Sequence, residues 1–157
     1  MLPTLKLKYG CLFVCMLAVF YGNAQLLSWS PDFIQEASAT VEITCDANFG
    51  NKGLINYTPT SDVYVHIGVI TNNSTSSTDW KYSKFTWGTT NVAAACTFLG
   101  NNKWKYAISG GLRSYFGITD VNEKILKIAI LFRTGSGSNV QRNADGSDMY
   151  VPVYDNT

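Results

Sequence analysis

The chain has 157 residues, with 12 basic and 11 acidic side chains and a formal net charge of +1 at pH 7. This balance offers no strong positive field to a nucleic acid or to an anionic membrane, so neither is expected as a partner. Apolar residues make up 46% of the chain, and its length is that of about one domain, so one folded domain is expected.

Residues 1–24 have the pattern of a secretory signal peptide. Lys6 and Lys8 precede an apolar run over 10–21, and small residues occupy the −1 and −3 positions of a cleavage site before Gln25. The run is shorter than the roughly 20 residues of a transmembrane helix. A retained signal anchor is the alternative. We expect cleavage before Gln25, export of residues 25–157, and no membrane span in the exported chain.

The first strands are predicted from the alternation of apolar and polar residues. Val41, Ile43 and Cys45 alternate with polar neighbours, which is typical of a strand with one buried face. The segment 48–60 is rich in Asn and Gly and predicts a long loop. The segment 62–70 is almost wholly β-branched or aromatic, which predicts a central strand buried on both sides.

The middle of the chain predicts a further strand and a hairpin. The segment 81–86 is expected to be a strand. The segments 94–99 and 103–108 are expected to pair around a turn at Gly100-Asn101-Asn102. The second strand of this hairpin places three apolar residues on one face: Trp104, Tyr106 and Ile108.

The last third contains one helical candidate, a single turn over 112–116. The segment 125–133 is the most apolar and predicts a core strand, 134–146 is a loop rich in Gly, Ser and Asn, and 149–154 is the final strand. Short strands separated by turns over about 130 residues predict an all-β fold. The expected architecture is an immunoglobulin-like antiparallel β-sandwich of seven to eight strands.

Two cysteines remain after removal of the signal peptide, Cys45 and Cys96. Both fall on the apolar side of their expected strands, and export would permit a disulfide between them. Because cysteine also behaves as a small apolar residue, buried free thiols are the alternative. The two cysteines and the single histidine are too widely spaced to suggest a metal site.

The sequence contains no recognisable catalytic constellation. An enzyme needs a nucleophile, an acid–base pair or a metal within hydrogen-bond reach. His66, the only histidine, has no Ser or Cys neighbour in a known motif. Asp145 and Asp148 are the only close carboxylate pair in an expected loop, and Gly146 between them indicates a turn. We therefore expect no catalytic residue, no metal and no cofactor.

The aromatic residues that follow a polar loop at 71–78 favour a binding function. Sugar rings present C–H faces that pack on indole and phenol rings, and their hydroxyls hydrogen-bond with His, Lys and Asn side chains. Trp80 and Tyr82 alternate with polar residues, so both rings are expected on one side of a strand, with Trp87 at its end. Burial of the same rings in the sandwich core is the alternative.

Several segments resemble one known family when taken in order. Val63-Tyr-Val-His-Ile-Gly68, a polar loop and Trp80 are similar to the starch-binding modules appended to bacterial α-amylases. More of the chain resembles the N-terminal β-sandwich domain of secreted bacterial α-amylase-family proteins and of outer-surface starch-binding proteins. This resemblance spans Leu27 to Tyr154 and is carried by six short segments: 27–31, 79–82, 87–88, 123–127, 132–133 and 145–154.

The resemblance implies a first set of ligand contacts. It places His66 as an imidazole contact and Trp80 as a stacking ring. In those modules the region corresponding to 134–148 contributes a further ring and Asn side chains. Here it offers Asn139 and Asn143 but no aromatic residue between Thr134 and Ser147.

Because the region 134–148 has no aromatic residue, the second stacking ring must come from another part of the chain. Tyr82 or Trp87 is expected to supply it, and Lys84 is expected as a further polar contact. Cys45 and Cys96 have no part in the resemblance.

The expected function is that of a secreted, non-catalytic carbohydrate-binding module for starch or another α-glucan. The resemblance implies a bacterial protein that is secreted, periplasmic or on the cell surface, with a covalently linked downstream catalytic domain. Two alternatives are an immunoglobulin-like spacer that binds nothing and a domain that adheres to a protein partner. Burial of Trp80, Tyr82 and Trp87 would indicate the spacer.

Overall fold

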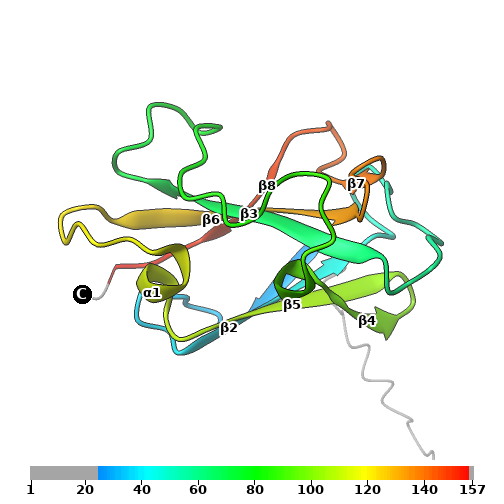
Figure 1. The fold of residues 1–157 in the computed structure, drawn as a ribbon, viewed down its shortest axis with the longest axis horizontal. Coiled ribbons are helices and arrows are strands. Elements are labelled where there is room, and N and C mark those ends of the chain that lie inside the picture. Colours follow the sequence, from blue (N-terminus) through cyan, green and yellow to red (C-terminus); the bar gives the residue numbers. More distant parts are fainter. Residues whose placement is uncertain (1–24, 156–157) are drawn as a thin grey trace, which may run out of the picture.

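The computed structural model describes residues 25–155, and the predicted signal peptide lies outside the described residues. The chain forms two antiparallel β-sheets packed face to face, which are the two layers of Figure 1. The all-β sandwich predicted from the sequence is confirmed. Among residues 25–155, no helix is long and apolar enough to cross a membrane.

The strand order is that of an immunoglobulin domain. One sheet has the order β1-β2-β5-β4, and in the other β6 pairs with β3 on one side and with β7 and β8 on the other. With the two-residue β7 set aside, these are the A-B-E-D and C-F-G sheets of a constant-type domain. The strands are β1 (Leu27–Ser30), β2 (Thr40–Asp46), β3 (Val63–Thr71), β4 (Thr97–Gly100), β5 (Lys103–Ser109), β6 (Ile125–Thr134), β7 (Val140–Gln141) and β8 (Met149–Pro152).

The predicted alternation explains how β2 and β5 build the core. Ile43 lies opposite Tyr106 and Cys45 opposite Trp104 in the antiparallel register, and all four side chains are buried. The 3₁₀ turn η1 (Val92–Ala94) precedes β4. The helical turn α1 (Leu112–Phe116) has the predicted bounds and ends at Gly117, whose φ of 74° is the left-handed conformation common after a helix.

The second sheet has a covered inner face and a partly open outer face. Alternate residues of β3, including Val65 and Ile67, point into the core, and their partners on β6 are Phe132 and Ile130. The intervening residues, including His66, lie on the outer face. Figure 1 shows the loop after β3 and the loop between β7 and β8 rising from that side, away from the β2–β5 layer.

The prediction of a regular strand over 81–86 is wrong. Only Lys81 pairs with β3, through two backbone hydrogen bonds to Val69, and Lys84 donates one more to the Ile67 carbonyl. A side chain at Gly68 would come within 2.8 Å of the Lys81 carbonyl, so the glycine permits this close approach. Tyr82 then adopts a φ of 53°, which ends the extended conformation.

The predicted alternative of a Cys45–Cys96 disulfide is also not seen, because both cysteines are free thiols. Cys45 lies on β2 and Cys96 immediately precedes β4, with β5 between these two strands. Two interstrand spacings amount to roughly 10 Å, more than the Cα separation that a disulfide spans. Burial raises the pKa of both thiols, which keeps them protonated and unreactive at neutral pH.

Candidate functional site

A groove on the outer face of the second sheet is centred on His66. In the register of β3 and β6, His66 lies opposite Leu131, and both side chains line the groove. Residues of the loop after β3 and of the loop between β7 and β8 form the sides of the groove around His66 and Leu131. The groove has a volume of about 300 Å³ and is lined by His66, Thr78, Trp80, Ser83, Trp87, Leu131, Arg142 and Asp148.

Two indole rings flank the imidazole at different angles. The ring of Trp80 stacks on His66, with centroids 5.5 Å apart and planes 21° apart. The ring of Trp87 meets His66 edge-on, with centroids 5.2 Å apart and planes 80° apart. The two indole planes are therefore steeply inclined to each other. Trp87 is 42% exposed, so it offers ring surface to a ligand.

The indole of Trp87 is held from behind by the end of β6 and the turn after it. The buried Arg133 guanidinium lies 5.6 Å from the ring, within the range of a cation–π contact. Gly137 packs directly against the indole, because a Cβ there would lie 2.5 Å from Nε1. A larger residue at 137 would push the ring, so the glycine helps to fix the position of Trp87.

The indole of Trp80 is held by its neighbours in sequence and by β8. Its Nε1–H donates to the Tyr150 hydroxyl at 3.4 Å, and the two rings meet edge to face. The preceding loop is closed by Asp79, whose carboxylate accepts from the backbone N–H of Thr75 and pairs with Lys81. These hydrogen bonds hold the pKa of Asp79 below its ordinary value. The stacking ring is thus attached to an ordered segment.

His66 is a neutral imidazole at pH 7. Its Nδ1 is buried and has no hydrogen-bond partner among the described residues. Burial lowers the pKa of His66 below 6.5, and the nearby Arg133 charge lowers it further. His66 therefore contributes an uncharged ring to the groove lining.

The lowered pKa of His66 predicts a loss of stability in mild acid. The unfolded chain binds a proton on this imidazole near pH 6.5, whereas the folded chain binds it only at lower pH. The contribution of His66 to the free energy of unfolding is therefore expected to be constant above pH 7 and to fall as the pH drops below 7. His66 is the only histidine, so His66→Gln is expected to abolish this slope in urea titrations. An unchanged slope in the variant would contradict the assignment.

Arg142 and Asp148 form an ion pair at one wall of the groove, at the two ends of the loop between β7 and β8. Both side chains are partly exposed, at 30% and 22%. The wall therefore presents a hydrogen-bond donor beside an acceptor, with no net charge from the pair.

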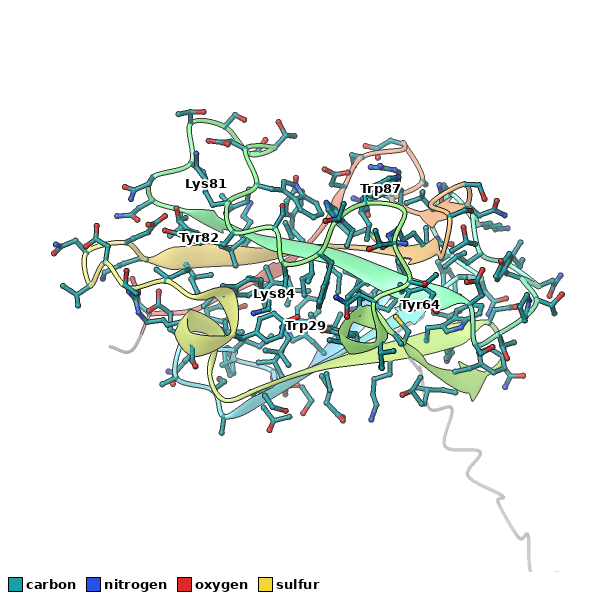
Figure 2. The ribbon with its side chains drawn as sticks, viewed as in Figure 1. Trp29, Tyr64, Lys81, Tyr82, Lys84 and Trp87 are labelled. Carbon is teal, nitrogen blue, oxygen red and sulfur yellow. The ribbon has the colours of Figure 1, made fainter. Side chains whose placement is uncertain are left out.

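Tyr82 and Lys84, predicted as ligand contacts, lie apart from the groove. The Tyr82 hydroxyl donates to the buried carboxylate of Glu123 at 2.6 Å, and Lys84 donates to the Tyr115 carbonyl at 2.5 Å. Figure 2 shows Tyr82 near the start of β6, well separated from Trp87. The expectation that the rings of Trp80 and Tyr82 share one side of a strand is wrong, because the left-handed residue Tyr82 redirects its side chain.

The two asparagines of the later loop also lie outside the groove lining. Asn139 is exposed, and its backbone N–H bonds to the Thr134 hydroxyl in the turn between β6 and β7. The Asn143 side chain donates to the Ser147 hydroxyl and to the Asp148 carbonyl at 2.7 Å. Asn143 thus shapes the loop that carries Asp148. Of the predicted contacts, the structure brings together His66, Trp80 and Trp87.

The polar wall residues were not among the predicted contacts. The sequence indicates a turn before Asp148 and gives no signal for Arg142. The contact between Arg142 and Asp148 depends on the conformation of the loop between β7 and β8. That conformation is set by hydrogen bonds, which the residue pattern does not reveal. A signal was available for Tyr150, because alternation in 149–152 places it on the outer face of β8, beside Ala129 of β6.

The groove is lined by one imidazole and one carboxylate, those of His66 and Asp148. Within residues 25–155, no three His, Cys, Asp or Glu side chains are grouped so that they could hold a metal ion. The one carboxylate that lines the groove, Asp148, is paired with Arg142. Comparison with known proteins gave no match to a protein-family model and no matching relative among curated proteins.

Proposed function

We propose that this protein is a non-catalytic carbohydrate-binding module. The observation that carries the proposal is the groove in which Trp80 and Trp87 both contact the His66 ring, with their indole planes at a steep angle to each other. Apolar ring surface beside hydrogen-bonding side chains suits a sugar, which has C–H faces and a rim of hydroxyls.

The inclined rings favour an α-glucan such as starch as the ligand. Chains of α-linked glucose curve, so two consecutive sugars present faces at an angle, whereas flat β-glucans favour coplanar rings. The resemblance to starch-binding domains supports the same ligand class. It also supports a place in a bacterial α-amylase-family protein that is exported and carries its catalytic domain downstream.

The affinity is expected to be low. Stacking on an aromatic side chain contributes about 1–3 kcal/mol per ring, taking nucleic-acid bases as a scale. Two such contacts correspond to dissociation constants in the micromolar to millimolar range. A polymer would raise the apparent affinity only by a statistical factor, because one chain offers many identical sites to a single groove.

Affinity electrophoresis in gels that contain amylopectin tests the proposal. The protein from residue 25 onward is expected to be retarded, and Trp80→Ala is expected to migrate as it does without polysaccharide. Phe33→Ala is the matched control, because Phe33 is 71% exposed, lies outside the groove lining and contacts only a second surface ring in the described aromatic pairs. The control is expected to remain retarded.

Two results would contradict the proposed function. If the wild-type protein migrates in amylopectin as it does without polysaccharide, the alternative of a spacer domain that binds no sugar would be favoured. Retardation that persists in a folded Trp80→Ala variant would place sugar binding elsewhere on the surface. Circular dichroism of each variant establishes that it is folded before its mobility is compared.

A further inference from the structure

We infer that the hydrogen bond between Tyr82 and Glu123 positions the indoles of Trp80 and Trp87, by holding a one-residue bulge in the segment that joins them. This inference rests on the proposed function. It gives Tyr82 and Glu123 a part in sugar binding as positioning residues, although neither side chain lines the groove.

The bulge lies between Lys81 and Lys84, along the edge of β3. Lys81 exchanges two backbone hydrogen bonds with Val69, and the backbone N–H of Lys84 donates to the Ile67 carbonyl. Three residue steps from Lys81 to Lys84 therefore face two steps on β3, as in an antiparallel β-bulge. Tyr82 has a φ of 53°, the left-handed conformation that a bulge commonly gives to glycine.

Tyrosine is an unusual residue for this conformation, so a specific contact is expected to hold it there. A bulky side chain makes the left-handed backbone unfavourable. Tyr82 is 39% exposed, so burial of its ring contributes little. Its hydroxyl donates to Oε2 of Glu123 at 2.6 Å, and a hydrogen bond to a carboxylate is one of the stronger kinds. We assign the restraint on Tyr82 to this hydrogen bond.

Glu123 is a fixed anchor for the tyrosine. It is buried two residues before β6, and its other oxygen accepts from the Thr71 hydroxyl at 2.6 Å. The hydrogen bonds from Thr71 and Tyr82 hold the pKa of Glu123 below its ordinary value, so the carboxylate is ionised at neutral pH. The Tyr82 side chain is thus tied to the body of the sandwich.

The bulge determines which residues after Trp80 face the groove. Ser83 passes over Gly68, where a Cβ would lie 3.3 Å from the Ser83 hydroxyl, and Ser83 lines the groove. Because side chains alternate between the two faces of an extended chain, a segment without the extra residue would turn Ser83 to the opposite face. Trp87 follows in the same segment, so loss of the bulge would also change its position relative to Trp80.

The indole N–H signals of the ligand-free protein, recorded by proton–nitrogen NMR, test this positioning. Tyr82→Phe keeps the ring and removes the hydroxyl, so the signals of Trp80 and Trp87 are expected to shift or broaden while that of the buried Trp104 stays in place. Glycine needs no restraint at a left-handed position, so in Tyr82→Gly the three signals are expected to remain near those of wild type.

Titration of the same proteins with maltoheptaose measures the consequence for binding. Tyr82→Phe is expected to bind about fivefold more weakly than wild type, because its groove must be ordered when the sugar binds. Tyr82→Gly is expected to bind within about twofold of wild type, because its bulge needs no tether. Circular dichroism establishes that each variant is folded before its affinity is compared.

The outcomes separate this inference from the proposed function. Signals of Trp80 and Trp87 that stay in place in Tyr82→Phe would overturn the positioning role and leave sugar binding intact. A larger perturbation in Tyr82→Gly than in Tyr82→Phe would show that the ring matters and its hydroxyl does not, which also overturns it. If the wild-type protein does not bind maltoheptaose, the proposed function is overturned, and the ligand-free signals decide the positioning of the indoles by themselves.

Discussion

Arg133→Ala is expected to lower the free energy of unfolding by about 2–4 kcal/mol. The fully buried guanidinium donates to the carbonyls of Thr134, Gly135 and Thr89 at 2.9–3.0 Å. Alanine would leave these carbonyls without the donor and would open a cavity below Trp87. Burial of the charged guanidinium also costs desolvation free energy, which the alanine variant does not incur. Part of the expected decrease in stability is therefore offset. Urea unfolding of the protein from residue 25 onward measures the difference.

Arg133→Met separates the two causes of this loss. Methionine restores most of the volume but none of the donors, so its stability is expected to lie between those of alanine and wild type. Since Arg133 also lies against the Trp87 ring, both variants are expected to bind amylopectin more weakly than wild type. A methionine variant as stable as the wild-type protein would contradict the role given to the hydrogen bonds.

Trp104→Ala is expected to cost about 3–5 kcal/mol of stability, the range for loss of a buried aromatic side chain. Trp104 is fully buried on β5, and its ring lies 5.0 Å from that of Phe98 on β4. Its Nε1–H donates to the Thr60 carbonyl at 3.0 Å, which ties the long loop before β3 to the sheet. The substitution therefore removes core volume and a loop attachment together.

Trp104→Phe retains a ring and removes the indole donor. Its expected cost is about 1–2 kcal/mol, from one unpaired carbonyl and a small cavity. Thermal unfolding followed by far-ultraviolet circular dichroism would rank wild type, phenylalanine and alanine in that order. An alanine variant as stable as the phenylalanine variant would contradict the packing described for this strand.

Most of the fold was predictable because its strands follow simple periodic patterns. The alternation through Val41, Ile43 and Cys45 indicated which face of β2 is buried, and a turn rich in Gly and Asn indicated the hairpin of β4 and β5. The apolar segment that became β6 could only be a core strand. These patterns depend on neighbours in sequence, so they are visible without the tertiary structure.

The candidate site was less predictable, because it depends on turns and on contacts between distant segments. The pattern of 81–86 suggests a strand. In the structure, Gly68 permits a close approach of the Lys81 backbone to β3, and the next residue, Tyr82, has a left-handed backbone conformation. Trp80 and Tyr82 therefore diverge. The meeting of Arg142 and Asp148 similarly depends on the hydrogen bonds of one loop, which residue pattern does not encode.

The most direct test of the groove as a sugar site is the response of the four indole N–H signals to maltoheptaose, followed by proton–nitrogen NMR. The four tryptophans are Trp29, Trp80, Trp87 and Trp104, and single substitutions would assign their signals. Sugar binding in the groove predicts that the signals of Trp80 and Trp87 shift in a saturable manner while the other two remain in place. Unchanged signals for both groove indoles at millimolar ligand, or shifts confined to Trp29 and Trp104, would contradict it.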